Sequence, residues 1–189
     1  MEIKNILEIK TRKEFREWLI ENHDKETECW FIVKKGKVKP DNAIWYLDSV
    51  EEALCFGWID TTNKTLNGVN LQKFTPRNKK SVWSELNKER CRRLEKLGLM
   101  TNAGRKVLPN MSENGFVIDR DVLYAFTENP TAWENFKKFP SLYQKIRIDT
   151  IQREKKDKMF WQRLKKLIEN SENNEMFGDW NDNGLLLYY

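Results

Sequence analysis

The segment from residue 49 to residue 105 constrains the fold most, because Trp, Cys, Gly and Pro-Arg are concentrated there more densely than a generic core or surface requires. After Gly57 the apolar spacing changes from a helical period to an alternating one. Residues 58–62 and 69–75 therefore predict a β-hairpin, with a bulge in its second strand and an end at Pro76. No motif of a known catalytic apparatus stands in this segment.

The residues before this segment predict a helix and a strand. Thr11 and Glu14 have the spacing of a capping box, which predicts a helix that starts there and ends near Asn22. Its inner face is expected to carry Phe15, Trp18 and Leu19. Residues 28–35 are rich in β-forming side chains and predict a strand that stops at Gly36.

Two further helices are predicted on either side of the hairpin. Asp48 or Ser49 is expected to cap the first, which places Glu51 and Glu52 in the turn where the helix dipole stabilises acidic residues. Ser81 is expected to cap the second. That helix ends at Gly98, and a short helix follows from Thr101 to about Leu108. The inner stripe of the Ser81 helix is predicted to consist of Val82, Leu86, Leu94 and Leu97.

The C-terminal part of the chain predicts helices only. Asn129-Pro130 combines a cap with a first-turn proline, and Pro140-Ser141 opens a helical stretch to about residue 170 that is broken in its middle. The fold class is therefore α+β, with a small antiparallel sheet and helices over residues 1–108. A linker over 109–117, a helical segment over 118–171 and a tail over 172–189 follow. The apolar end of the tail is expected either to dock as an edge strand or to stay mobile.

Composition limits the kinds of site that the chain can contain. His23 is the only histidine, and the three cysteines stand far apart in the sequence. These counts argue against a histidine-based metal centre and against a Ser-His-Asp triad, so we expect no metal and no cofactor. An odd number of cysteines is typical of a reducing compartment, where they are expected to be reduced, with Cys55 buried.

The N-terminal sequence and the overall hydropathy bear on location. Residues 1–10 alternate apolar and charged side chains, unlike a secretory signal peptide. No apolar run approaches the roughly 20 residues that a membrane-spanning helix needs. A cytoplasmic protein without a membrane span is the expectation.

The formal net charge of +5 is unevenly distributed. Residues 73–96 and residues 145–166 each contain nine basic and three acidic residues. Glu85, Glu89 and Glu95 interleave with the basic residues of the first segment, which is typical of a solvated helix face. Because no nucleic-acid-binding motif accompanies either segment, we expect only weak, salt-sensitive binding to DNA or RNA.

Polar residues near the start of the Ser81 helix form the candidate binding site. Residues at a spacing of three share one helix face, and Arg77, Lys79 and Lys80 precede it, so the free N–H groups and positive charges predict a corner that binds an anion. The alternatives are plain capping by Ser81 and a turn-forming role for Asp60. The candidate ligand-binding residues are Asp60, Arg77, Ser81, Trp83, Ser84 and Asn87.

Taken together, the motifs of residues 51–60, 74–87 and 98–104 resemble the YdeI/OmpD-associated family, also called bacteriocin-protection proteins. Phe139-Pro-Ser and the basic helix after it fit the same pattern, so the resemblance covers nearly the whole chain. Members often carry a second arginine where this chain has Asn78. The resemblance implies an α+β unit grouped with frataxin-like and YjbR-like domains, followed by helices. Its implied functional associations are stress resistance and the cell envelope.

The function expected from these features is that of a small cytoplasmic accessory protein that binds a small anionic ligand or a protein partner, with no established reaction. One rival is an enzyme on a small anionic substrate, with Arg77 as an electrophilic clamp and Asp60 as the base; it lacks an activated nucleophile. The other rival is a nucleic-acid-binding module that uses the two basic segments. The oligomeric state is not predicted by any of these features.

Overall fold

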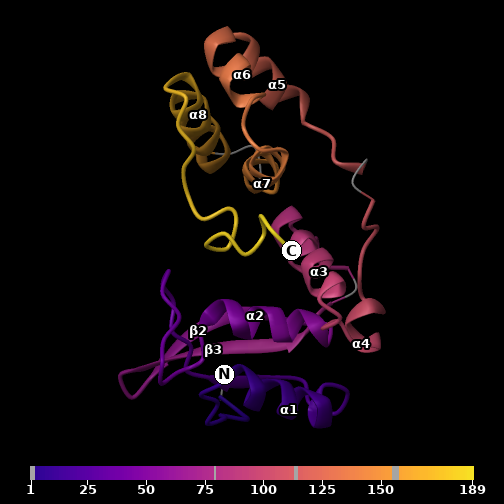
Figure 1. The fold of residues 1–189 in the computed structure, drawn as a ribbon. Coiled ribbons are helices and arrows are strands. Elements are labelled where there is room, and N and C mark those ends of the chain that lie inside the picture. Colours follow the sequence, from indigo (N-terminus) through magenta and orange to yellow (C-terminus); the bar gives the residue numbers. More distant parts are fainter. Residues whose placement is uncertain (1–2, 79, 113–114, 155–157) are drawn as a thin grey trace. The chain divides into compact units, whose positions relative to one another are not determined.

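A computed structural model describes residues 3–78, 80–112, 115–154 and 158–189 of the chain (Figure 1). The chain forms two compact units. The first contains residues up to 82, residues 90–109 and Tyr189, and the second contains residues 83–89 and 110–188. The four sequence-based segment boundaries stay predictions, and residues 113 and 114 of the predicted linker lie outside the described residues.

The first unit confirms the α+β class, because its described residues form an antiparallel three-stranded sheet with helices (Figure 1). The strands β1 (Cys29–Phe31), β2 (Trp58–Leu66) and β3 (Val69–Pro76) lie in the order β1-β3-β2. The predicted hairpin is confirmed as the β2–β3 pair. Its register shifts between Asp60 and Asn63, so the extra residue lies in the first strand. The prediction that placed the bulge in the second strand is wrong.

Strand β1 is shorter than the predicted run of residues 28–35. It pairs with β3 over three residues, and the chain beyond it makes an isolated bridge between Lys34 and Trp45. Lys34 accepts a hydrogen bond from the Tyr46 N–H and donates one to the Ile44 carbonyl, at 2.9 and 3.0 Å. The backbone of residue 34 therefore bonds to the entry of the next helix instead of continuing the sheet ladder.

Helix α1 (Arg12–Asn22) confirms the predicted capping box. The Glu14 N–H donates to Thr11 Oγ1 at 3.2 Å, and the Thr11 N–H donates to Glu14 Oε2 at 3.0 Å. Phe15 on the inner face packs against Phe31 and Phe74, with ring centroids 4.6 and 5.3 Å away. These buried rings join α1 to the sheet.

Helix α2 (Tyr46–Cys55) begins earlier than the sequence predicted. Its N-cap is Trp45, and no side chain caps it, so the predicted cap at Asp48 or Ser49 is wrong. Ser49 lies inside the helix, where its hydroxyl donates to the Tyr46 carbonyl at 2.7 Å. The helix is buried from Leu47 to Cys55.

Helix α3 (Glu85–Lys96) begins later than predicted, because Ser84 and not Ser81 supplies the cap. The Asn87 N–H donates to Ser84 Oγ at 3.2 Å, which is the bond of an N-cap side chain to the third helical residue. The predicted apolar stripe is half wrong: Leu94 is buried, whereas Val82 and Leu97 are exposed. The predicted end is confirmed, since Gly98 has the left-handed φ of +68°.

Helix α4 (Asn102–Arg105) starts after Thr101, as predicted, and packs closely on the end of α2. Thr101 donates to the Cys55 carbonyl from both its hydroxyl and its N–H, at 2.6 and 3.1 Å. A Cβ added at Gly104 would lie 2.3 Å from the same carbonyl oxygen. The two helices can approach this closely only because residue 104 has no side chain.

The second unit consists of the start of α3 with helices α5 (Arg120–Thr127), α6 (Pro130–Phe136), α7 (Ser141–Gln152) and α8 (Lys158–Glu172). The Asn129 cap of α6 is confirmed by the Ala132 N–H at 3.1 Å. The long helical stretch after Pro140 is confirmed as two helices. Residues 155–157 between them lie outside the described residues.

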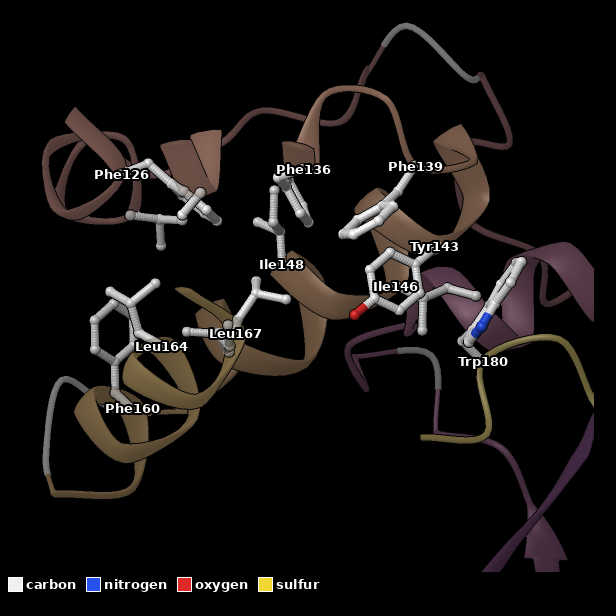
Figure 2. Packing of buried hydrophobic residues seen from close by; sticks show 13 residues of the cluster. Phe126, Phe136, Phe139, Tyr143, Ile146, Ile148, Phe160, Leu164, Leu167 and Trp180 are labelled. Carbon is white, nitrogen blue, oxygen red and sulfur yellow. The ribbon is translucent and has the colours of Figure 1, made fainter. Parts of the chain in front are cut away.

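The core of the second unit is a cluster of aromatic and aliphatic side chains from α5 to α8 (Figure 2). Phe126 stacks on Phe136 at 4.9 Å between ring centroids. The tail contributes Trp180, which lies edge-on to Tyr143 at 5.5 Å. Residues 173–189 form turns and no strand, so the edge-strand alternative is wrong; Trp180 and Leu186 are buried, whereas Leu187 and Tyr188 are exposed.

We predict that Gly104→Ala destabilises the first unit. The new Cβ would overlap the carbonyl oxygens of Cys55 and Leu54, which belong to the backbone and cannot rotate away. The expected loss in the free energy of unfolding is about 1–3 kcal/mol, measured by chemical denaturation. Gly115→Ala is the matched control, because nothing lies within 4 Å of a Cβ there. Equal effects of the two substitutions would contradict the proposed close contact.

Candidate functional site

Three of the predicted site residues lie in the first unit, where they bond to other parts of that unit. The Tyr46 hydroxyl donates to Asp60 Oδ2 at 2.6 Å. Arg77 is buried, and its Nη2 donates to the Val82 carbonyl at 2.9 Å. Ser81 is exposed, and its hydroxyl donates to the Asn78 carbonyl at 2.7 Å. The first bond joins α2 to β2, and the other two lie within the loop between β3 and α3.

The other three predicted residues, Trp83, Ser84 and Asn87, lie in the second unit. Ser84 acts there as the cap of α3 through the Asn87 N–H. Lys79, which was expected to add positive charge, lies outside the described residues. That all six residues surround one anion stays a prediction.

The electrostatics of Arg77 differ from those of an exposed anion clamp. Burial lowers the pKa of its guanidinium, and the nearby Cys91 and Asp60 only partly oppose this effect. The cation is thus held in an apolar surrounding with an internal carbonyl as an acceptor. A structural role accounts for that arrangement as well as a ligand does.

The sequence analysis missed a cluster of buried ion pairs around α2. Glu51 and Glu52, which were expected in the first turn of a helix, are only 2% and 1% exposed. Glu52 accepts from Arg12 Nε at 2.5 Å and from Arg16 Nη1 at 2.7 Å. Glu51 accepts from Arg12 Nη1 at 2.7 Å and from Arg93 Nη1 at 2.5 Å. All four carboxylate oxygens of these two residues are therefore occupied.

This ion-pair cluster is structural, because occupied carboxylates cannot serve as a general base without first losing a partner. Asp48 extends the cluster, with Oδ2 2.6 Å from Lys39 Nζ and Oδ1 3.3 Å from Arg12 Nη1. Burial lowers the pKa of Arg12, but Glu52 and Glu51 outweigh burial and the net shift is upward. No local signal marked this burial, because Asp48, Glu51 and Glu52 fall on one helix face, as they would on a solvated side.

The second unit contains a pocket lined by basic side chains. Its volume is about 220 Å³, and it lies among α7, α8 and the tail. Arg147 and Thr150 come from α7, Arg163 and Lys166 from α8, and Phe177 from the tail. Ile151 and Leu167 complete the lining, so three cations border a partly apolar hollow. We call this the basic pocket.

Arg147 is fixed within the basic pocket by ring and backbone contacts. Its guanidinium carbon lies 4.8 Å from the Phe177 ring centroid and 5.6 Å from that of Tyr143. Its Nη2 lies so close to Gly178 that a Cβ there would be 2.3 Å away. Its Nε is buried and has no hydrogen-bond partner among the described residues. Burial lowers the pKa of Arg147, with Tyr143 and Asp179 opposing it.

The two other cations of the basic pocket are held differently. Arg163 Nη1 lies 2.6 Å from Glu154 Oε1 and donates to the Thr150 carbonyl at 3.0 Å. The Lys166 ammonium lies 4.9 Å from the Phe177 ring centroid. Phe177 therefore places two positive charges by cation–π contact. The sequence analysis counted these residues only as part of a basic segment, because nothing in the pattern placed Phe177 beside them.

A larger hollow of about 550 Å³ lies in the first unit. It is bordered mainly by aliphatic side chains of the N-terminal segment and the hairpin. Ile6, Ile32, Leu66 and Val69 are 38–50% exposed there. This lining offers an apolar surface but few polar groups to orient a ligand.

The described residues bear on metal and membrane binding in two ways. They contain no group of three or more His, Cys, Asp or Glu side chains that could hold a metal ion. Across the same residues, no helix is both long enough and apolar enough to cross a bilayer.

We predict that Glu52→Gln destabilises the first unit by about 2–4 kcal/mol, because it removes a buried carboxylate that compensates the charges of the half-buried Arg12 and Arg16. The free energy of unfolding from urea titration measures this loss. Glu17→Gln is the control: it removes a carboxylate from an exposed pair with Lys13 and should cost less than about 1 kcal/mol. A loss of that small size for Glu52→Gln would mean that the cluster does not stabilise the fold.

The three cysteines are free and buried, as predicted, and we expect them to react slowly in the folded protein. Burial raises the pKa of Cys29, and it raises the pKa of Cys55 and of Cys91 to about 12. At neutral pH each remains a thiol, which is a poor nucleophile. Labelling with a disulfide reagent at pH 7 should be slow before unfolding and complete after it. One thiol that reacts faster than free cysteine would contradict this expectation.

Two family models match separate parts of the chain. Residues 7–107 match the family described as "Domain of unknown function (DUF8412)". Residues 116–174 match the family described as "Bacteriocin-protection, YdeI or OmpD-Associated". The same comparisons found no curated protein and no solved structure that matches the chain.

These matches confirm the resemblance to YdeI/OmpD-associated proteins, over a shorter stretch than the sequence analysis expected. The motifs of residues 51–104 lie in the part that matches the domain of unknown function, whereas the basic pocket's helices lie in the other part. The first match covers more than half of the 189 residues. The chain therefore belongs to the DUF8412 family, and residues 116–174 form a YdeI/OmpD-associated domain.

Proposed function

We propose that this protein is an accessory protein that binds a small anionic ligand in the basic pocket. The observation that carries the proposal is the convergence of Arg147, Arg163 and Lys166 on one hollow, where no carboxylate of the described residues lies within ion-pair distance of Arg147 or Lys166. An anion in the hollow would supply the missing negative charge. The YdeI/OmpD-associated match supports an accessory role without naming a reaction.

The energetics of Arg147 support this assignment. A buried donor without a partner costs about 1–3 kcal/mol, and a buried cation costs more unless an anion accompanies it. Guanidinium groups bind carboxylates and phosphates through two parallel hydrogen bonds, which makes arginine well suited to orient such a ligand. An anion that binds in the pocket would offset this free-energy cost, and that gain would contribute to its affinity.

We also propose that the protein is cytoplasmic. Three free cysteines fit a reducing compartment, which favours the cytoplasm.

The corner of Asp60, Arg77, Ser81, Trp83, Ser84 and Asn87 remains the second candidate site for the anion. Each hydrogen bond described above for Arg77, Ser81 and Ser84 has a structural explanation, so we rank this site below the basic pocket. An enzyme that uses Asp60 as its base is disfavoured for a similar reason. Asp60 already accepts a hydrogen bond from Tyr46.

We predict that Arg147→Met weakens anion binding at least about tenfold, since hydrogen bonds to charged groups contribute about 1.5–3 kcal/mol. Calorimetric titration with acetate, sulfate and phosphate at constant ionic strength measures the affinity. Lys166→Met should weaken binding less, and Lys165→Met is its matched control. Lys165 is the neighbouring α8 residue, 76% exposed, and it does not border the basic pocket.

Two further measurements distinguish an effect on folding from an effect on the binding site. Arg147→Met should unfold at the same temperature as the parent protein or higher when no anion is added, because it removes a buried cation. If Ser81→Ala weakens binding while Arg147→Met does not, the anion binds at the second candidate site. Absence of saturable binding to any of the three anions would refute the proposal.

A further inference from the structure

The balance of charge in the basic pocket restricts which anion it can accept. Glu154 lies 2.6 Å from Arg163 and compensates that cation. Asp179 acts on Arg147 electrostatically from the tail, although it is not within ion-pair distance. Lys166 contacts the Phe177 ring, and within the described chain it forms no ion pair. Among the described residues named here, three cations and two carboxylates leave about one positive charge for a ligand.

The apolar part of the lining restricts the ligand further. Ile151, Leu167 and Phe177 border the same hollow as the cations. At about 30 Å³ for each water-sized group, 220 Å³ holds about seven such groups, which is a carboxylate with about five further carbon atoms. A nucleotide is too large for this volume. An inorganic anion would leave the apolar side chains facing water.

We infer that the basic pocket selects a small organic monocarboxylate, whose carboxylate meets Arg147 and Lys166 and whose short apolar body lies against Ile151, Leu167 and Phe177. This inference rests on the proposed function and adds the charge and the chemical class of the ligand. Glu154 and Asp179 are the residues that set the charge preference, because each brings a negative charge near a cation that borders the hollow.

The first experiment tests the apolar body. Acetate, butyrate, hexanoate and decanoate are titrated into the full chain by calorimetry at constant ionic strength. Each methylene that enters the hollow should tighten binding about two- to fourfold, given about 0.8 kcal/mol for complete burial of a methylene. The gain should stop near hexanoate, where the pocket is full. Equal affinities for acetate and hexanoate would overturn the assignment of an organic ligand.

The second experiment tests the charge preference. Butyrate should bind more tightly than succinate, which has the same carbon skeleton length with a second carboxylate, and more tightly than phosphate. The double variant Glu154→Gln with Asp179→Asn adds about two units of positive charge near the pocket, so succinate and phosphate should gain at least about fivefold relative to butyrate. Glu134→Gln with Glu169→Gln is the matched control. These two acids are exposed and do not border the basic pocket.

The outcomes distinguish this inference from the proposed function. If anions bind in a manner that depends on Arg147 but phosphate binds as tightly as butyrate, the proposed function stands and the monocarboxylate assignment is wrong. If no anion binds, both fail. If the double variant and its control change the preference equally, long-range charge and not the two named carboxylates determines it, and their assigned role is refuted. Thermal unfolding of each variant without ligand shows whether a loss of binding reflects a loss of fold.

Discussion

The buried ion pairs around α2 are the interaction on which the first unit depends. A helix that is buried from Leu47 to Cys55 has no solvated face for its three acids, so each must meet a cation inside the protein. Arg12 and Arg16 come from α1, and Arg93 comes from the end of α3. Arg16 also donates to the Leu99 carbonyl at 2.9 Å. One set of charges thus ties three helices and a loop together, with a directionality that apolar packing alone lacks.

The close approach of α4 to α2 depends on the same buried helix. Cys55 ends α2, and its carbonyl accepts two hydrogen bonds from Thr101. Gly104 leaves room for that carbonyl because it has no side chain. Gly57 adopts a φ of +75°, so that the chain can turn into β2. Cys55, Gly57 and Gly104, which are among the residues that made this part of the sequence conspicuous, are therefore explained by backbone geometry. They specify how helices and strands meet, and none of them requires a ligand.

Local signals in the sequence predicted much of this fold, whereas contacts between residues far apart in the chain could not be predicted from it. The Thr11 capping box, the β2–β3 hairpin, Gly98 and the Asn129 cap each depend on residues within a few positions, and the structure confirms them. The starts of α2 and α3 were misplaced, because α2 begins at Trp45 without a side-chain cap and because Ser81 and Ser84 were both available as caps for α3. The burial of Glu51 and Glu52 could not follow from a propensity rule, since it depends on arginines about forty residues away along the chain.

The candidate site shows the same division between local and distant information. The spacing of Ser81, Ser84 and Asn87 was readable, but spacing cannot say whether a hydroxyl caps a helix or meets a ligand. The basic pocket needed the converse information, because its Phe177 and Asp179 lie in a tail that pairs with α7 and α8 only in three dimensions. A basic segment in a sequence therefore does not distinguish a solvated face from a pocket; the side chains that surround each cation do.

Two half-buried arginines, Arg12 and Arg147, illustrate this distinction. Each has one nitrogen without a hydrogen-bond partner among the described residues. For Arg12 the pKa is shifted upward despite burial, because carboxylates lie in direct contact. For Arg147 burial lowers the pKa, and no carboxylate of the described chain lies within ion-pair distance to reverse that effect. The first arginine is complete as a structural element. The second is held by aromatic rings beside a hollow, and this difference is the physical basis on which we propose anion binding in the second unit.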